Sequence, residues 1–227
     1  MTSQAILIVT WYGTVKYCLE LLKSLENYKD YPLVVAINEV EKLTDTEFLG
    51  YLQSHSIEVL PIVGNRWESG GLMAASVFSP YQEFILIQDT LEVKDPSIFN
   101  QMFAYEGRSV AFGDGWLCYL GKYRREVLNQ VIIPTCFTKM DAFYHEVKLG
   151  ALYNWVAAHV EGQAPIVMFP EWKNENPNNW IEEKFERQNL VLDNPYLIKR
   201  KSILWGNMGP FNGALAWESP TKATKEG

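Results

Sequence analysis

Residues 5–88 alternate short apolar runs with stretches of helical periodicity, and this alternation constrains the fold more than any other feature. Residues 5–10 form a continuous apolar run, which is typical of a strand covered on both faces. From Thr14 onward, apolar residues return every three or four positions, which predicts a helix with Thr14 as its cap. Similar patterns predict strands over 33–37, 57–60 and 84–88, and helices over 44–54 and 72–78. This order predicts an α/β fold, with a Rossmann-like, mostly parallel sheet and helices on both faces.

The remainder of the chain is less regular. Its pattern favours a strand over 110–120, a short helix over 123–129 and a long helix over 141–160. Further along, it predicts a strand over 166–169, a polar loop over 174–179, a charged helix over 181–187 and a disordered end over 221–227. The chain has 227 residues and neither an internal repeat nor a clear linker, so we expect a single domain over 1–227.

The chain is acidic, with 20 basic and 27 acidic side chains and a net charge of −7. This balance argues against nucleic acid and anionic membranes as partners, because both attract an excess of Lys and Arg. No apolar run approaches the roughly 20 residues of a membrane span, and no basic residue precedes the first run as in a secretory signal. The three cysteines are an odd number without metal-type spacing, which favours reduced thiols and a cytoplasmic location.

Polar residues and glycines follow each predicted parallel strand, at the edge where ligands bind in open sheets. They are Thr10, Trp11, Tyr12 and Gly13 after the first strand, Asn38 and Glu39 after the second, residues 64–71 after the third, and Asp89 after the fourth. Thr10, Tyr12, Asn38 and Glu39 can contact a base and a ribose, although such residues are also common in ordinary turns. Neither G-x-G-x-x-G nor G-x-x-x-x-G-K-[ST] follows the first strand, so a dinucleotide or P-loop site is not expected.

The loop over 64–71 and Asp89 are candidates for binding a diphosphate. Gly70 and Gly71 let a ligand approach the backbone, the following helix N-terminus favours phosphate, and Arg66 adds a bidentate positive partner. Asp89 directly follows a buried strand, where a carboxylate can hold a divalent cation that neutralises a diphosphate leaving group. The alternatives are a flexible loop with a solvated arginine, and an aspartate that caps a helix or a turn.

Three of these features, in the same order, resemble GT-A-type glycosyltransferases of the family 2 kind. They are a buried strand ending in Thr10-Trp-Tyr, a G-N-x-x-x-x-G-G loop before a helix, and an apolar strand ending in Asp89. Residues 121–128, Gly-Lys-Tyr-Arg-Arg-Glu-Val-Leu, resemble the "G…a-x-R-R-e-v-l" stretch of these enzymes, and residues 141–149 resemble their acidic helix start. The resemblance covers residues 5–160. It implies a nucleotide-binding half over 1–100, an acceptor half over 101–170 and a C-terminal lid or tail over 171–227.

The resemblance implies hexosyltransferase-like transfer of a sugar from a nucleotide-diphosphate donor, assisted by Mn²⁺ or Mg²⁺. It favours inversion over retention and a UDP-sugar over a GDP-sugar. The acceptor is an unknown glycan, lipid or protein. Asp89 matches the last acid of the D-x-D metal motif, Gly70 and Gly71 match the loop beside the diphosphate, and Asp141 matches the base. Asp141 and His145 lie at i, i+4 and share a helix face, which makes His145 the next candidate base, whereas Glu146 points roughly 140° away from Asp141. The chain departs from the pattern in two respects, because Gln88-Asp89-Thr90 keeps a single acid and because Asp141 and Glu146 are five residues apart rather than adjacent.

Other residues are candidates for contacts with substrate. Asp114 and Trp116 lie in the aromatic strand region, where Trp116 can stack on a sugar face or be an ordinary buried tryptophan. The basic residues 199–201 can close over a diphosphate as a lid, or form a solvated charged surface. Two other functions stay open on this fold. The single acid favours a catalytically inactive protein that binds a sugar nucleotide or a glycan, whereas a nucleotidyltransferase would usually carry a basic glycine-rich loop after the first strand.

Overall fold

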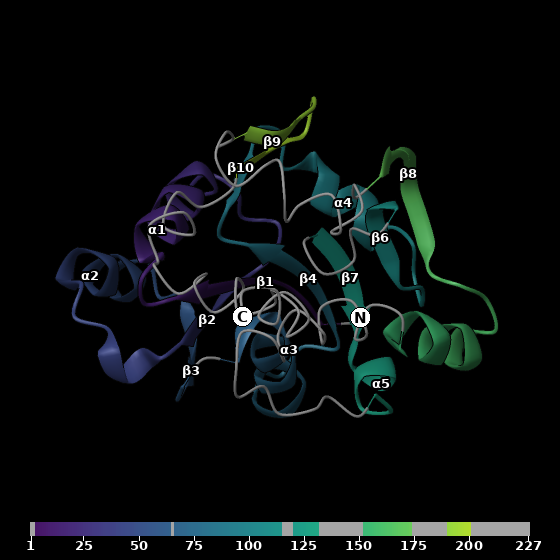
Figure 1. Ribbon diagram of the computed structural model, residues 1–227, viewed down its shortest axis with the longest axis horizontal. Helices are drawn as coiled ribbons and strands as arrows, with labels where there is room; N and C mark the ends of the chain where they lie inside the picture. Colours follow the sequence, from purple (N-terminus) through teal and green to yellow (C-terminus); the bar gives the residue numbers. More distant parts are fainter. Residues whose placement is uncertain (1–2, 65, 115–119, 132–151, 174–189, 201–227) are drawn as a thin grey trace, which may run out of the picture.

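The computed structural model describes residues 3–64, 66–114, 120–131, 152–173 and 190–200 (Figure 1). In these ranges the helices are α1 (Val15–Ser24), the 3₁₀ turn η1 (Val40–Lys42), α2 (Thr46–Ser54), α3 (Trp67–Phe78), α4 (Ser97–Phe103), α5 (Arg125–Leu128) and residues 152–161. The strands are β1 (Gln4–Trp11), β2 (Leu33–Asn38), β3 (Glu58–Ile62), β4 (Glu83–Gln88), β5 (Leu91–Val93), β6 (Val110–Asp114), β7 (Leu120–Arg124), β8 (Ile166–Lys173), β9 (Leu190–Asp193) and β10 (Leu197–Arg200).

The described strands form a main sheet of seven strands in the order β3-β2-β1-β4-β7-β6-β8. Strands β1 to β4 are parallel, β7 is antiparallel to both β4 and β6, and β8 is parallel to β6. The chain first builds the sheet outward from β1 to β3 and then returns to place β4 on the other side of β1. The strand order therefore reverses between β1 and β4, which confirms the predicted Rossmann-like, mostly parallel α/β sheet.

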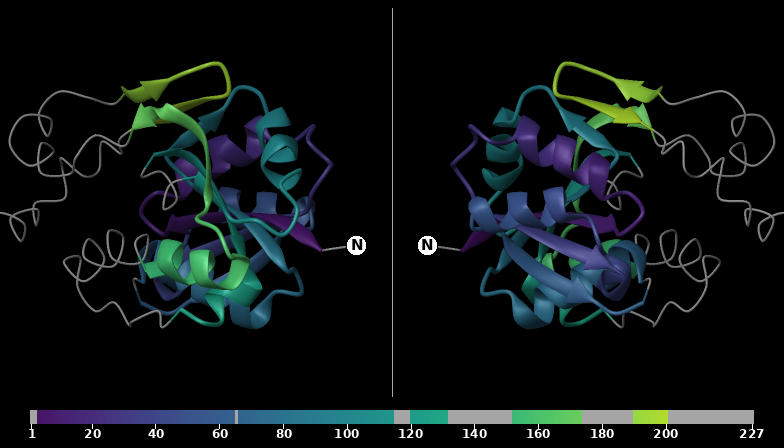
Figure 2. Two further views of the ribbon diagram at one scale, coloured as in Figure 1. Left: turned by 90° about the vertical axis from the view of Figure 1, so that its right-hand side faces the viewer. Right: turned by 90° about the vertical axis from the view of Figure 1, so that its left-hand side faces the viewer.

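Helices cover both faces of the main sheet (Figure 2). One apolar core joins α1, α2 and α4 to a face that includes Ile8 and Ile87, and a second joins α3, α5 and residues 152–161 to the opposite face, which includes Val9 and Leu86. Residues of β1 from Ala5 to Ile8 have no exposed surface. Burial on both faces explains why these strands are uninterrupted apolar runs rather than alternating ones.

Helix α1 buries the predicted apolar positions, among them Val15, Cys18, Leu19 and Leu22. The predicted capping role of Thr14 is wrong, although Thr14 occupies the N-cap position, because its side chain makes no capping hydrogen bond. The Thr14 hydroxyl instead donates to the main-chain oxygen of Trp11 and to Asp89. A buried hydroxyl has only one proton to give, and here an anion and a carbonyl compete for it.

Several predicted boundaries move once strands pair. The single strand expected over 110–120 corresponds to β6 and the first residue of the antiparallel β7. Tyr123, expected in a helix, belongs to β7 and is fully buried against Tyr153, so the helix there starts only at Arg125. The predicted elements over 174–179, 181–187 and 221–227, and residues 141–151 of the long helix, lie outside the described residues.

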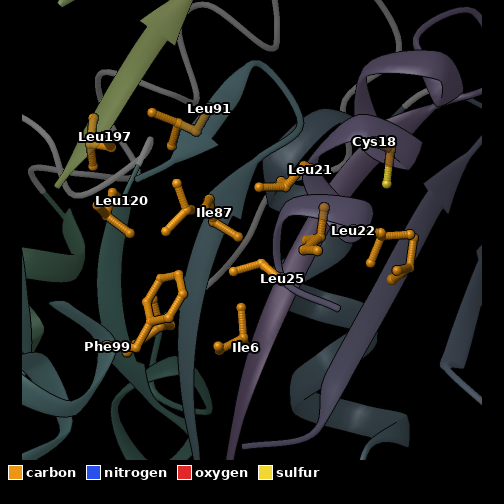
Figure 3. Close-up of a cluster of buried hydrophobic side chains, with 14 of the residues drawn as sticks. Ile6, Cys18, Leu21, Leu22, Leu25, Ile87, Leu91, Phe99, Leu120 and Leu197 are labelled. Carbon is orange, nitrogen blue, oxygen red and sulfur yellow. The ribbon is translucent and has the colours of Figure 1, made fainter. Parts of the chain in front are cut away.

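A small second sheet has the order β5-β10-β9. It pairs antiparallel strands from two distant parts of the chain, since β5 follows β4 closely and β9 and β10 come from residues 190–200. Leu197 of β10 has no exposed surface and belongs to the same core cluster as Leu91, Ile87 and Leu120 (Figure 3). The apolar side chain of Leu197 therefore fixes β10 beside the end of β4.

Candidate functional site

The point where the strand order reverses carries a cluster of two hydroxyls and a carboxylate, which we call the edge cluster (Thr10, Thr14 and Asp89). Thr10 Oγ1 donates to Asp89 Oδ2 at 2.8 Å, and Thr14 Oγ1 donates to the same oxygen at 2.5 Å. Thr10 is the last residue but one of β1, Asp89 follows β4, and Thr14 precedes α1. The cluster thus lies at the carboxyl ends of the two strands where an open α/β sheet binds its ligand.

Asp89 faces the same side of the sheet as α1. Asp89 lies in the turn after β4 and accepts from Thr10 and Thr14. Thr10 alternates with Ile6 and Ile8, which belong to the core under α1, and Thr14 directly precedes α1. The N-terminus of α1 favours a negative charge there. Fully buried Cys18 lies below the cluster, and burial, together with the nearby charge of Asp89, raises the pKa of its thiol well above the usual value. Cys18 is therefore a protonated, unreactive packing residue.

Asn38 joins three elements at the same edge. Its side-chain Nδ2 donates to the main-chain oxygen of Thr10 at 3.2 Å, and its Oδ1 accepts from the main-chain nitrogen of Arg66 at 2.8 Å. Only 1% of Asn38 is exposed. This residue therefore fixes the end of β1 against the start of α3, and its predicted contact with a base stays a prediction.

Glu39 connects the first two strand ends through its side chain. It adopts a left-handed backbone conformation with φ 53°, and its carboxylate accepts from Trp11 Nε1 and from Lys42 Nζ. Trp11 meets Tyr12 edge to face at 4.8 Å between ring centroids, and Lys42 lies over the Tyr12 ring at 5.5 Å. Tyr12 and Glu39, which were predicted to contact the base and ribose, thus lie together with Trp11. Lys42 was missed, although its place three residues after Glu39 in a helical turn was a usable signal.

The loop expected over 64–71 is shorter than predicted, because α3 already begins at Trp67 and contains Gly70 and Gly71. A Cβ at Gly71 would overlap the side chain of Val9, and one at Gly70 would overlap the Cβ of Arg66. The glycines therefore allow α3 to pack closely on β1 and β2. The start of α3 lies beside Asn38, so the helix N-terminus and Arg66 are at the same sheet edge as the edge cluster.

A second carboxylate occupies the other face of this sheet edge. Gln88 Nε2 donates to Glu68 Oε1 at 2.7 Å, and only 8% of Gln88 is exposed. Gln88 alternates with Leu86, which packs in the core under α3, so its side chain lies on the α3 face. Glu68 is therefore a second acid at this sheet edge that sequence reasoning missed, because 20 residues separate it from Gln88.

The metal role predicted for Asp89 depends on what surrounds it. The positions two residues before and after it are Ile87 and Leu91, both buried in the apolar core, so neither side of the motif supplies another ligand. Within the described residues no group of three His, Cys, Asp or Glu side chains could hold a metal ion. A single carboxylate such as that of Asp89 is compatible with Mg²⁺, which is usually bound through one or two carboxylates together with phosphates and water.

The structure does not describe the remaining predicted site residues to the same depth. Asp114 ends β6, next to β7 and β8 in the sheet, and its side chain is outside the described part. Trp116 and the three candidate bases, Asp141, His145 and Glu146, lie outside the described residues altogether. Their roles stay predictions.

This sheet, with polar side chains gathered at its point of reversal, defines a GT-A-like α/β fold. No protein-family model matches the chain, and no curated protein matches it by sequence. Among solved structures it is similar to the mannosyltransferase PcManGT from Pyrobaculum calidifontis in complex with GDP-Man and Mn²⁺, with a TM-score of 0.50 and 11% identity. The match covers 74% of this chain and 55% of that one, so the chain spans about half the length of this neighbour. The likeness confirms the predicted fold.

Two further neighbours are more distant. A cytidylyltransferase from Leptospira borgpetersenii serovar Hardjo-bovis has a TM-score of 0.44 at 15% identity, over 67% of this chain and 74% of that chain. S. aureus TarS 1-349 has a TM-score of 0.41 at 13% identity, over 57% of this chain and 49% of that chain. In the described part of the chain, no helix is both long and apolar enough to cross a bilayer.

Proposed function

We propose that the protein is a glycosyltransferase that moves a hexose from a nucleotide-diphosphate donor, preferably a UDP-sugar, to a glycan, lipid or protein acceptor. The observation that carries the proposal is the position of Asp89, whose carboxylate is held by two threonine hydroxyls at the reversal point of a GT-A-like sheet. In this arrangement Trp11, Tyr12 and Glu39 bind the base and ribose. Arg66 and the N-terminus of α3 face the diphosphate.

Asp89 is the residue that would hold Mn²⁺ or Mg²⁺. Such a cation supplies positive charge to the diphosphate, which gains negative charge as it leaves. The hydroxyls of Thr10 and Thr14 orient Asp89 Oδ2, so the carboxylate needs little reorganisation on binding. The mannosyltransferase neighbour was solved with GDP-Man and Mn²⁺, which supports this assignment without fixing the base of the donor here.

For the transfer itself we propose inversion with Asp141 as the base. The acceptor oxygen forms a bond to the anomeric carbon while the bond from that carbon to the diphosphate oxygen breaks. The acceptor proton moves to the Asp141 carboxylate, with His145 and Glu146 as the next candidates. Asp114 and Trp116 would bind the sugar or the acceptor. We place the reaction in the cytoplasm, and the free thiol of Cys18 agrees with a reducing compartment.

The second candidate is a catalytically inactive protein that binds a sugar nucleotide or a glycan. The single acid of the Gln88-Asp89-Thr90 motif favours it, because the positions two residues before and after Asp89, Ile87 and Leu91, are buried and apolar. The two candidates differ in one observable, since only the transferase releases a nucleoside diphosphate.

The test measures nucleoside diphosphate release from UDP-, GDP- and CDP-sugars, with and without Mn²⁺, by the wild type and by Asp89→Asn. Asn keeps an acceptor for the two threonines but loses the charge, so we expect a fold close to the wild type and a loss of about 10²- to 10³-fold in rate. Asp30→Asn is the matched control, because Asp30 is exposed and bonded to Asn100 away from the crevice. Full activity in Asp89→Asn would contradict its role, and binding without release would favour the second candidate.

A further inference from the structure

Gly64 lies two residues after β3 and is bound through both of its main-chain groups to the turn after β2. Its carbonyl oxygen accepts from the main-chain nitrogen of Glu39 at 2.9 Å. Its own nitrogen donates to the Glu41 carboxylate, at 3.2 Å to Oε1 and 3.3 Å to Oε2. Glu41 belongs to η1 and is exposed, so its hydrogen bond to Gly64 is made outside the apolar core.

The same segment also holds the start of α3. Asn38, the last residue of β2, accepts at its Oδ1 from the main-chain nitrogen of Arg66 at 2.8 Å, and α3 begins at the next residue, Trp67. Helix α3 packs on β2 and β3 (Figure 1). The position of its first turn at the sheet edge therefore depends on hydrogen bonds that residues 38–41 make to Gly64 and Arg66.

On its other side, this segment contacts the residues proposed to bind the base. The Glu39 carboxylate accepts from Trp11 Nε1 and pairs with Lys42, whose ammonium lies over the Tyr12 ring. Residues 38–42 thus connect the end of β1, where the base and ribose would bind, to the chain before α3, where the diphosphate would bind. The spacing of these two regions is set by this one segment.

We propose that Glu41 is a positioning residue that holds the chain before α3 at the distance from the base-binding residues that a nucleoside diphosphate spans. The inference rests on the proposed function and deepens it, because it names a residue that matches the two halves of the donor to each other. Glu41 acts through Gly64 and does not itself contact the ligand. Two linked groups bind more tightly than either alone only where both sites can be engaged together, and a loop held in place before binding loses less entropy.

The test separates the hydrogen bond of Glu41 from its charge by comparing Glu41→Ala with Glu41→Gln. Both variants remove the same negative charge, which by itself would favour an anionic ligand, but only glutamine keeps an oxygen that can accept from Gly64. Calorimetric titration measures the affinities for UDP, GDP, CDP and ADP, and NMR titration measures those for the four parent nucleosides. We expect Glu41→Ala to bind the diphosphate about 3- to 10-fold more weakly than Glu41→Gln, with unchanged nucleoside affinity in both.

Glu106→Ala is the matched control, because Glu106 is exposed after α4. Its neighbour Tyr105 accepts through its main-chain oxygen from Lys122, which pairs with Glu83 at the start of β4. Glu106 is therefore at the opposite edge of the sheet, and its substitution should change neither affinity.

Equal diphosphate affinities of Glu41→Ala and Glu41→Gln, or tighter binding by Glu41→Ala, would overturn the inference, because the hydrogen bond to Gly64 would then not contribute. An equal loss for nucleoside and diphosphate would also overturn it, since damage to the base-binding residues would explain the result. Failure of the wild type to bind any of the four diphosphates would overturn the proposed function itself, and this inference with it. The two failures are therefore distinguishable.

Discussion

Two polar clusters in the molecule are built in opposite ways. The edge cluster at the end of β1 and β4 is partly open, since Asp89, whose Oδ2 accepts from the two threonine hydroxyls, is half-buried. The second, which we call the anchor cluster (Ser109, Tyr153 and Glu161 with Arg108 and Arg124), is closed. It attaches the helix over 152–161 to the main sheet, and the Glu161 side chain has no exposed surface.

Every donor around Glu161 is supplied by the protein. Its carboxylate accepts from the main-chain nitrogen and the hydroxyl of Ser109, at 2.9 and 2.6 Å, and pairs with Arg108 and Arg124 at 3.4 Å each. Tyr153 Oη lies 2.7 Å from Ser109 Oγ and accepts from the main-chain nitrogen of Arg124 at 2.9 Å. Burial raises the pKa of Tyr153 far above its usual value, so the phenol stays neutral.

The difference indicates different roles for the two clusters, with the anchor cluster stabilising the fold and the edge cluster proposed to bind a ligand. A closed network leaves no acceptor for a ligand, and its loss exposes buried charges to an apolar surrounding. At a carboxylate that is open to solvent, water can replace a lost hydrogen-bond donor, and the carboxylate can also accept a cation or a ligand. We therefore expect that disrupting the anchor cluster lowers the free energy of unfolding strongly, and that disrupting the edge cluster lowers it only slightly.

The largest expected effect on stability is that of Glu161→Ala. It leaves Ser109 and two arginines without their buried acceptor, which should lower the free energy of unfolding by about 3–5 kcal/mol. Urea unfolding measures this directly. The control is Glu171→Ala, because Glu171 is exposed on β8 and should change the free energy by less than about 0.5 kcal/mol. A decrease of less than about 1 kcal/mol in the free energy of unfolding of Glu161→Ala would contradict the structural role of the anchor cluster.

A smaller effect is expected from Thr14→Val at the edge cluster. Valine keeps the shape but removes one donor to Asp89, while Thr10 still donates and water can reach the carboxylate. We expect a loss of about 0.5–1.5 kcal/mol in the free energy of unfolding, measured in the same urea titration. Thr44→Val, at an exposed position before α2, serves as the control and should be close to neutral. A loss as large as that of Glu161→Ala would show that the edge cluster is structural.

The strands of the first half were predictable because their signal is local. Residues 5–10, 33–37 and 84–88 are apolar runs without interruption, and both faces of β1, β2 and β4 are indeed covered. The missed elements depend on distant partners. β5 has three residues and exists through its pairing with β10, about a hundred residues further along the chain. A local sequence pattern cannot predict a strand that depends on a pairing partner so far along the chain.

The location of the site could be predicted from the sequence, but the hydrogen bonds within it could not. Strand ends of a parallel sheet converge by topology, so Thr10, Asn38 and Asp89 could be expected at one edge. The two hydroxyls on Asp89 come from residues 79 and 75 positions away, and only the packed structure brings them together. The sequence places Gly70 and Gly71 in a loop because glycine is rare inside helices, whereas both lie within α3, where Gly71 packs closely on Val9 and Gly70 on Arg66.

The central claim is that the carboxyl edge of β1 and β4 binds a nucleoside diphosphate. Thermal unfolding with UDP, GDP, CDP and ADP, each with and without Mn²⁺, tests it most directly. A ligand at 100 times its dissociation constant adds about 2.7 kcal/mol, which is roughly 5–10 °C for a chain of this size. The account predicts such a shift with one of the four nucleotides, larger with Mn²⁺ and reduced in Asp89→Asn. No shift with any of them would contradict the claim.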